Sequence, residues 1–231
     1  MSRDKIIVAL DLPTKEEALK IIDVLGDKIS FYKVGSVLFT QYGPEIITEL
    51  KKRNKKVFLD LKYLDIPNTV AHAVHEAVKL KVHMLTLHTS GGFRMLKEAS
   101  LIADAVGGDH APVLLGVTVL TSMKEKDLFE IGINRKVASQ VKKLAVIAKN
   151  AGIKGIVCSS RELSIVKKVN KDFIAVVPGI RPAFSEAGDQ KRTAEPAEAI
   201  KMGADYLVIG RPIIKAQDPL EAVEKIIKSI E

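Results

Sequence analysis

The chain has 231 residues, of which 47% are hydrophobic and 28% are charged. This length suits one domain with a sizeable core, and the composition argues against intrinsic disorder. The net charge is +8, but the basic residues are scattered and only 5% of residues are aromatic, with no tryptophan, so the stacking platforms of a nucleic-acid-binding protein are not expected. A basic surface can instead steer a small anionic substrate inward.

The cysteine content and the first residues bear on the compartment. Cys158 is the only cysteine, which excludes a disulfide within the chain and suits a reducing compartment. Residues 1–4 lead directly into an apolar run without the features of a signal peptide, and no apolar stretch has the length of a transmembrane helix. We therefore expect a cytoplasmic protein that does not associate with membranes.

Short apolar runs alternate with amphipathic segments along the chain. Most runs are continuously apolar, which is typical of strands buried on both faces of a parallel sheet. The predicted strands are Ile6–Asp11, Phe31–Gly35, Val57–Lys62, Met84–Thr89, Val113–Val119, Gly155–Ser159, Ile174–Pro178 and Tyr206–Gly210.

The segments between these strands have helical patterns. In the first of them Thr14 is a good N-cap, Glu17 suits the positive end of the helix dipole, and Gly26 ends the apolar stripe. The other predicted helices are Pro44–Arg53, Asn68–Leu80, Gly92–Ala105, Ala138–Ala151, Arg161–Val169, Glu195–Met202 and Pro219–Ile230.

A strand followed by a helix, repeated along the whole chain, predicts an α/β fold: a single (β/α)₈ TIM barrel over residues 1–231. A doubly wound open sheet would give the same alternation. An open sheet concentrates its site at one switch point, whereas here charged residues lie at the ends of several strands. No G-x-G-x-x-G motif follows the first strand, which also favours the barrel.

The third predicted strand ends in a group of charged residues. Asp60 and Lys62 are two positions apart, so a regular strand would place them on one face, and Asp65 follows in the next loop. Neighbouring carboxylates favour the protonated form of Lys62, and a protonated lysine beside a reacting carbon is a general acid. The alternative is a structural salt bridge, but Asp11 and Lys33 at neighbouring strands favour a functional site.

Two later loops have the composition of an anion site. Pro178-Gly179-Ile180-Arg181 follows the seventh strand and Gly210-Arg211 follows the eighth. The loops after these strands often build the phosphate site of such barrels, with glycine allowing close approach and arginine donating paired hydrogen bonds. The alternative is that the glycines only form turns and the arginines are solvated.

Other polar segments are less specific. The loop 183–193, with Gln190, suits either a lid over the phosphate or an ordinary surface loop. Thr121 and Ser122 suit either contact with a substrate or an N-cap. No spacing of His72 and His75 with carboxylates completes a metal motif, and His88 at the end of the fourth strand is a weaker candidate for the barrel mouth.

Six segments together resemble the orotidine 5′-phosphate decarboxylase family over the whole chain. The most specific is the D-x-K-x-x-D-I-P-N-T stretch. The segments are residues 9–11 (Ala-Leu-Asp), 32–35 (Tyr-Lys-Val-Gly), 60–69 (Asp-Leu-Lys-Tyr-Leu-Asp-Ile-Pro-Asn-Thr), 117–122 (Val-Thr-Val-Leu-Thr-Ser), 178–181 (Pro-Gly-Ile-Arg) and 210–212 (Gly-Arg-Pro).

The resemblance implies decarboxylation of orotidine 5′-phosphate to UMP in pyrimidine biosynthesis, with no metal or organic cofactor. Lys62 is the implied proton donor to C6 of the pyrimidine, and Asp60 is the carboxylate that orients it. Asp65, with Ile66 and Thr69, is implied to reach the active site of a partner chain in a homodimer. The other implied substrate contacts are Asp11 and Lys33 at the ribose, Thr121 at the pyrimidine, and Pro178, Arg181, Gln190, Gly210 and Arg211, most of them around the phosphate.

Two alternatives remain open at this point. Sugar-phosphate decarboxylases and hexulose-phosphate synthases resemble the same D-x-K-x-x-D frame but use Mg²⁺ and an enediolate. They typically carry glutamate in place of Lys33 and differ after the second aspartate, so Lys33 and Ile66-Pro67-Asn68-Thr69 argue against them. A non-catalytic phosphate- or nucleotide-binding barrel would leave Asp60 and Lys62 a structural role only.

Overall fold

The computed structural model describes residues 2–184 and 193–231. Within these residues parallel strands β1 to β8 pair in chain order and close into a barrel. The strands are β1 (Ile6–Ala9), β2 (Phe31–Gly35), β3 (Lys56–Tyr63), β4 (Met84–His88), β5 (Val113–Val117), β6 (Gly155–Val157), β7 (Ile174–Val177) and β8 (Tyr206–Ile209).

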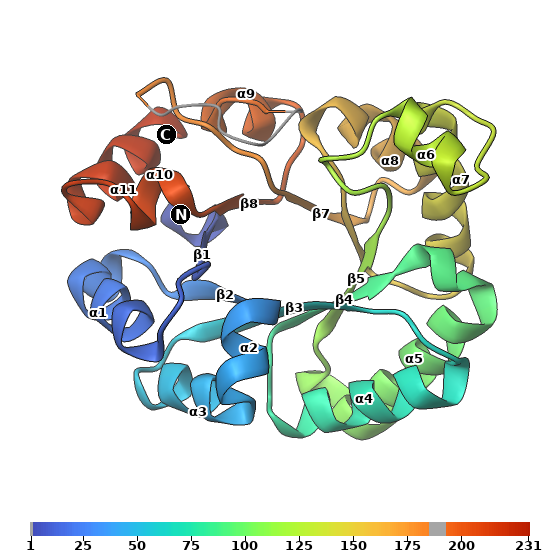
Figure 1. The fold of residues 1–231 in the computed structure, drawn as a ribbon, viewed down its shortest axis with the longest axis horizontal. Helices are drawn as coiled ribbons and strands as arrows, with labels where there is room; N and C mark the ends of the chain where they lie inside the picture. The colour runs from blue at the N-terminus through green and yellow to red at the C-terminus, as the bar shows by residue number, and fades with distance from the viewer. Residues whose placement is uncertain (1, 185–192) are drawn as a thin grey trace.

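The pairing of β8 with β1 decides between the two predicted architectures. Ile6 pairs with Leu207 and Val8 with Ile209, so the sheet has no free edge at this point. The predicted barrel is therefore confirmed and the open sheet was the wrong alternative. Figure 1 shows the strands as an inner ring with the helices arranged outside it.

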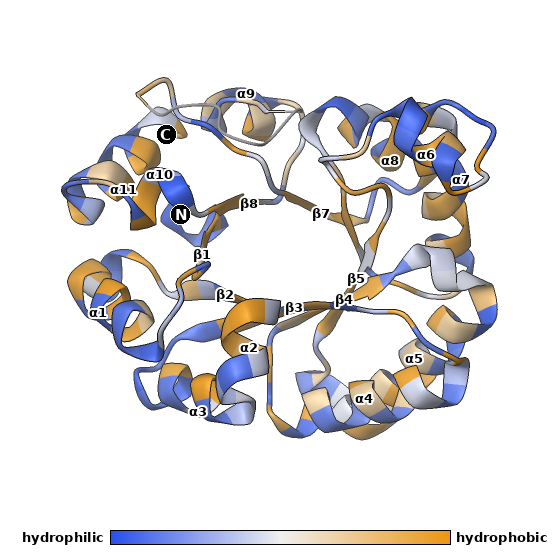
Figure 2. Ribbon diagram, viewed as in Figure 1, coloured by the Kyte–Doolittle hydropathy of each residue, from blue (hydrophilic) through white to orange (hydrophobic). Residues whose placement is uncertain are grey.

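The helices that cover the strands are amphipathic, and their apolar sides pack on the barrel. Figure 2 shows the strands as largely hydrophobic and the helices as mixed, as expected when the strands are buried on both faces and the helices on one. The helices are α1 (Lys15–Leu25), α2 (Ser36–Tyr42), α3 (Pro44–Lys52), α4 (Pro67–Lys79), α5 (Gly92–Gly107), α6 (Glu125–Glu130), α7 (Val137–Asn150), α8 (Leu163–Val169), α9 (Pro196–Lys201), α10 (Arg211–Ile214) and α11 (Pro219–Ser229).

Local sequence explains the ends of α1. The Thr14 side chain accepts a hydrogen bond from the backbone N–H of Glu17 at 3.2 Å, as predicted for an N-cap. Gly26 ends the helix with φ of 45°, a left-handed conformation that favours glycine. Within the described residues no helix is both long and apolar enough to cross a bilayer.

Three short helices were not predicted, namely α2, α6 and α10. They have between four and seven residues, too few for a helical period to appear in the sequence. Most predicted strands also end one or two residues too late. Strand β1 ends at Ala9, so Asp11 lies in the loop beyond it and not within the strand.

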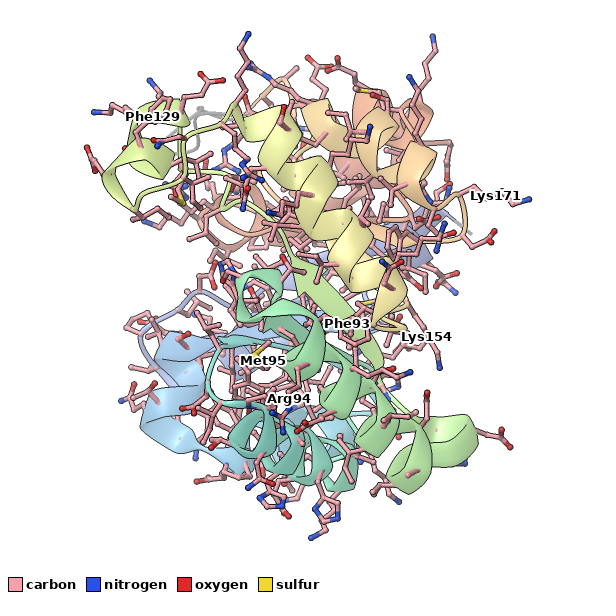
Figure 3. All side chains as sticks on the ribbon, turned by 90° about the vertical axis from the view of Figure 1, so that its right-hand side faces the viewer. Phe93, Arg94, Met95, Phe129, Lys154 and Lys171 are labelled. Atoms are coloured by element: carbon pink, nitrogen blue, oxygen red, sulfur yellow. The ribbon has the colours of Figure 1, made fainter. Side chains whose placement is uncertain are left out.

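The two ends of the barrel are separate in Figure 3. Phe129 of α6, which follows β5, marks the end formed by the carboxyl ends of the strands. Lys154, just before β6, and Lys171, just before β7, lie toward the opposite end. Of the residues that the sequence singled out, Asp11, Thr121, Arg181 and Arg211 lie just beyond the carboxyl ends of their strands, where the sites of this fold are found.

Candidate active site

A cavity of about 750 Å³ opens at the carboxyl ends of the strands. Its floor is apolar, because Ala9, Phe58, Val176 and Val208 line it and also belong to the cluster that fills the barrel interior. Charged residues stand on its wall, from β1, β2 and β3 on one side and from the loops after β7 and β8 on another. Within the described residues this apolar cluster therefore closes the barrel below the cavity.

Four side chains on this wall form a chain of alternating charge, which we call the charged array: Asp11, Lys33, Asp60 and Lys62. The Lys33 Nζ lies 3.0 Å from Asp11 Oδ1 and 3.5 Å from Asp60 Oδ2. The Lys62 Nζ donates to Asp60 Oδ1 at 2.9 Å. The spacing prediction that Asp60 and Lys62 contact each other is thus confirmed.

Burial differs along the array. The side chains of Lys33 and Asp60 are only 10% and 12% exposed, whereas those of Lys62 and Asp11 are 39% and 59% exposed. The middle pair is therefore held inside the wall, and Lys62 and Asp11 remain accessible to a ligand. Gly35 leaves room for Lys33, because a Cβ there would lie 3.1 Å from its Nζ.

Burial and pairing act in opposite directions on the two inner groups. Burial by itself disfavours the charge of Lys33, but Asp60 and Asp11 outweigh it and raise the pKa of Lys33. Burial likewise opposes the charge of Asp60, but Lys33 and Lys62, with hydrogen bonds from Lys62 and Thr86, lower the pKa of Asp60. Both inner groups are therefore charged at neutral pH.

The backbone at Lys62 departs from a regular strand. Lys62 has φ of 50°, a left-handed conformation that is unusual outside glycine, and the register between β3 and β4 shifts between Leu59 and Tyr63. The prediction placed Asp60 and Lys62 on one face of a regular strand. The contact exists, but an irregular backbone produces it.

The second part of the wall contains the predicted anion site, which we call the arginine sector: Gly179, Arg181, Gly210 and Arg211. All four line the cavity, and Arg211 begins α10 directly after Gly210. The Arg181 Nη1 donates to the carbonyl of Ile180 at 2.8 Å. The sector joins the charged array, since a Cβ on Gly210 would lie 3.6 Å from Asp11 Oδ2.

Other predicted site residues divide into two groups. Thr121 and Pro178 line the cavity, as expected. Asp65, Ile66 and Thr69 are not among the described residues that line it. Asp65 is exposed, and its Oδ1 accepts from the backbone N–H of Ile66 at 2.6 Å, so the chain does not bring it to its own Lys62.

Two further predictions concern the rim. Gln190 and most of the predicted lid, residues 185–192, lie outside the described residues. His88 does not line the cavity among these residues, and its Nδ1 lies 2.7 Å from Ser90 Oγ. Burial and the nearby Lys62 lower the pKa of His88.

Among the residues at the site that the sequence did not single out, Thr86 and Lys215 carry polar groups. Thr86 donates from its hydroxyl to Asp60 at 3.0 Å; the available signal was a polar residue in the middle of an apolar strand. Lys215, directly after α10, lines the cavity together with Arg211. A lysine four positions after that arginine was visible in the sequence, but the short helix between them was not.

Comparison with known proteins identifies the family. The model of the Orotidine 5′-phosphate decarboxylase / HUMPS family matches residues 4–226. The chain belongs to this family. Relatives named orotidine 5′-phosphate decarboxylase include one from Actinobacillus succinogenes, 50% identical over 98% of this chain and 97% of the relative. Another, from Glaesserella parasuis, is 49% identical over 98% of this chain and 99% of the relative.

Solved structures agree with this family assignment. The crystal structure of orotidine 5′-phosphate decarboxylase from Lactobacillus acidophilus has a TM-score of 0.85 and 38% identity, and covers 99% of each chain. An uncharacterized conserved protein from Geobacillus kaustophilus has a TM-score of 0.86 and 35% identity, over 98% of this chain and all of the other. The resemblance drawn from the sequence motifs is thus confirmed at the level of family and fold.

Proposed function

We propose that the protein decarboxylates orotidine 5′-phosphate to UMP in pyrimidine biosynthesis, with no metal or organic cofactor. Lys62 is the proton donor to C6 of the pyrimidine. The observation that carries this proposal is the charged array beside the arginine sector in one cavity, with the Lys62 Nζ 2.9 Å from Asp60. The names of the relatives support the same reaction.

The chemistry requires stabilisation of a localised negative charge. When the bond between C6 and the carboxylate breaks, CO₂ leaves and the electron pair stays on C6, where the pyrimidine ring delocalises it poorly. An ammonium already fixed beside C6 stabilises this pair without reorganisation. Lys62 then donates its proton to C6, which forms UMP and leaves a neutral amine that solvent reprotonates.

The rest of the array holds Lys62 in place. Asp60 receives the Lys62 ammonium and lies close to the departing carboxylate. Lys33 links Asp60 to Asp11, and in the proposed complex Lys33 and Asp11 contact the ribose hydroxyls. Lys33 is buried, so its charge is tolerated only while its ion pairs with the two carboxylates are kept. These ion pairs hold Lys33 in place, which suits this role.

The arginine sector binds the phosphate in this proposal. Arg181 and Arg211 donate to phosphate oxygens, Gly210 allows the backbone to approach, and Gln190 of the lid completes the grip. Thr121 and Pro178 lie toward the pyrimidine. The phosphate is remote from the bond that breaks, so its binding energy acts by holding the substrate against the array and not by contact with that bond.

The proposed active unit is a homodimer in which Asp65, Ile66 and Thr69 enter the partner's cavity. Two observations support this arrangement. These residues do not line the cavity of their own chain among the described residues, and Leu64 and Ile66 are 55% and 67% exposed. Apolar side chains this exposed next to a carboxylate suit a subunit interface. We also propose a cytoplasmic location, which suits the lone buried Cys158.

The direct test is an absorbance assay of purified protein with orotidine 5′-phosphate in EDTA, repeated with added Mg²⁺. We expect full conversion to UMP in EDTA and no increase with Mg²⁺. Absence of UMP, or strict dependence on Mg²⁺, contradicts the proposal. Mg²⁺ dependence with a sugar-phosphate substrate would assign the chain to the metal-dependent reaction described above.

A further inference from the structure

The irregular part of β3 leaves one residue of β4 facing three residues. Leu59 pairs with Leu85, and the next pair is Tyr63 with Leu87. Asp60, Leu61 and Lys62 therefore all lie opposite Thr86. A register shift of this kind interrupts the ladder of backbone hydrogen bonds, so the freed groups need other partners.

The side chain of Thr86 provides such a partner. The backbone N–H of Lys62 donates to Thr86 Oγ1 at 2.9 Å, and the same hydroxyl donates to Asp60 Oδ1 at 3.0 Å. Asp60 Oδ1 also receives the Lys62 ammonium at 2.9 Å. These bonds form a ring that begins at the backbone of Lys62 and ends at its own side chain.

The ring is partly buried, and its Thr86 corner lies inside the protein. Thr86 is fully buried, with 0% exposure. Hydrogen bonds inside a protein are electrostatically stronger than those in water, and a buried partner left unsatisfied is costly. The ring also supports a left-handed backbone at Lys62, which is unfavourable for a residue with a Cβ and needs support from its surroundings.

We propose that Thr86 is a positioning residue for the reaction: its hydroxyl fixes the backbone of Lys62 and the carboxylate of Asp60 together, and so aims the Lys62 ammonium into the cavity. This inference rests on the proposed function. Thr86 does not line the cavity among the described residues, so it acts through Asp60 and Lys62 and not on the substrate.

Thr86→Val tests the hydroxyl, because valine keeps the shape and removes both hydrogen bonds. We expect kcat to fall about 10- to 100-fold, the range expected when a hydrogen bond to a charged group is lost. The dissociation constant for UMP should stay within about threefold of wild type, since the arginine sector is unchanged. Thr86→Ser restores the hydroxyl and should keep at least about a third of the wild-type kcat.

A matched control is Thr89→Val. Thr89 is also fully buried, and its hydroxyl donates to the carbonyl of Val117 at 2.6 Å, outside the array. Its kcat should equal that of wild type. A wild-type kcat in Thr86→Val, or a loss of UMP binding in proportion to kcat, would overturn the positioning role. If Thr86→Val does not fold, Thr86→Ala and Thr86→Ser provide the same contrast. Failure of Thr86→Ser to restore kcat would then rule out the positioning role.

A crystal structure separates this inference from the proposed function. If wild-type protein does not decarboxylate orotidine 5′-phosphate, the proposed function fails, but the geometry can still be tested. We expect Thr86→Val to lose the contact between Lys62 Nζ and Asp60 that measures 2.9 Å here, or to lose the left-handed backbone at Lys62. Retention of both contradicts the inference, whatever the substrate.

Discussion

The charged array and the arginine sector are held in position in different ways. Asp60 and Lys33 belong to strands, are about nine-tenths buried, and lie within 3.5 Å of each other. Arg181 and Arg211 follow the ends of β7 and β8, and the chain from Arg181 leads into the loop that the sequence predicts as a lid. The charged array is held by ion pairs among its own members, whereas Arg181 lies in the segment after β7 and Arg211 at the start of α10.

This difference suits two separate tasks. Stabilisation of a transition state works best with charges that need no reorganisation, which the paired array provides. Capture and release of a phosphate require donors that can close and open. We therefore expect changes in the array to reduce kcat and changes in the arginine sector to weaken substrate binding.

The largest effect should come from Lys62→Ala. Removal of the proposed proton donor and its charge should reduce kcat by at least about 10⁴-fold, while UMP binds within about threefold of wild type. Steady-state assays and calorimetry measure the two quantities. Lys81→Ala is the matched control. Lys81 has a left-handed backbone with φ of 53°, close to the 50° of Lys62, but it is exposed and lies outside the site. Substantial turnover by Lys62→Ala would remove Lys62 from its role.

Asp65→Ala should come next, with kcat lowered by about 10²- to 10³-fold, because in the proposed homodimer each site loses a carboxylate from the partner chain. Co-expression of Asp65→Ala with Lys62→Ala should restore about a quarter of wild-type activity, since half of randomly paired dimers have one intact site. Purified mixed dimers isolate this fraction. Mixed dimers as inactive as the parent variants would show that Asp65 does not act across the interface.

Arg211→Ala should have a smaller effect, and on binding. Loss of a charged hydrogen bond to phosphate should raise KM and the dissociation constant for UMP about 10- to 100-fold, with a change in kcat below about tenfold. Binding of uridine, which lacks the phosphate, should not change. Arg94→Ala, whose side chain is 84% exposed on α5, is the control. Equal weakening of UMP and uridine would place Arg211 away from the phosphate.

The smallest expected effect concerns pH. Despite burial, Asp60 has a lowered pKa, so its contribution to stability is present above about pH 3.9 and is lost as pH falls through the lower folded value. Despite burial, Lys33 has a raised pKa, so its contribution is present below about pH 10.4 and is lost as pH rises through the higher folded value. Titration of these two groups should therefore leave kcat at saturating substrate flat between about pH 5 and 9. The pairing would be contradicted if kcat fell on the acidic side of that window and the fall were absent in Asp60→Asn. Asp60 would then titrate within the window.

The sequence predicted the barrel and much of the array for clear physical reasons. Continuous apolar runs identify buried parallel strands, and charged residues in such runs are costly unless they are paired or functional. Lys33 and Asp60 therefore stand out in the sequence alone. The arginine sector followed from glycine and arginine at the ends of the last two strands.

The role of Thr86 could not be predicted in the same way. The rule that alternate residues share a face assumes a regular strand, whereas β3 bulges between Leu59 and Tyr63. That irregularity depends on the register with β4, which is a tertiary property. Similarly, Asp65 follows Lys62 by only three residues, but it is not among the described residues that line the cavity of its own chain. That separation is a property of the fold and not of the sequence spacing.

Asp60→Asn tests the division between the two sectors most directly. Asparagine keeps the size of Asp60 and removes the negative charge with which Lys33 and Lys62 both pair. Parallel measurement of kcat and of the dissociation constant for UMP should give a kcat at least about 100-fold lower and an affinity within about threefold of wild type. An unchanged kcat, or a loss of affinity as large as the loss of kcat, would contradict the claim that the array performs the chemistry and the arginine sector the binding.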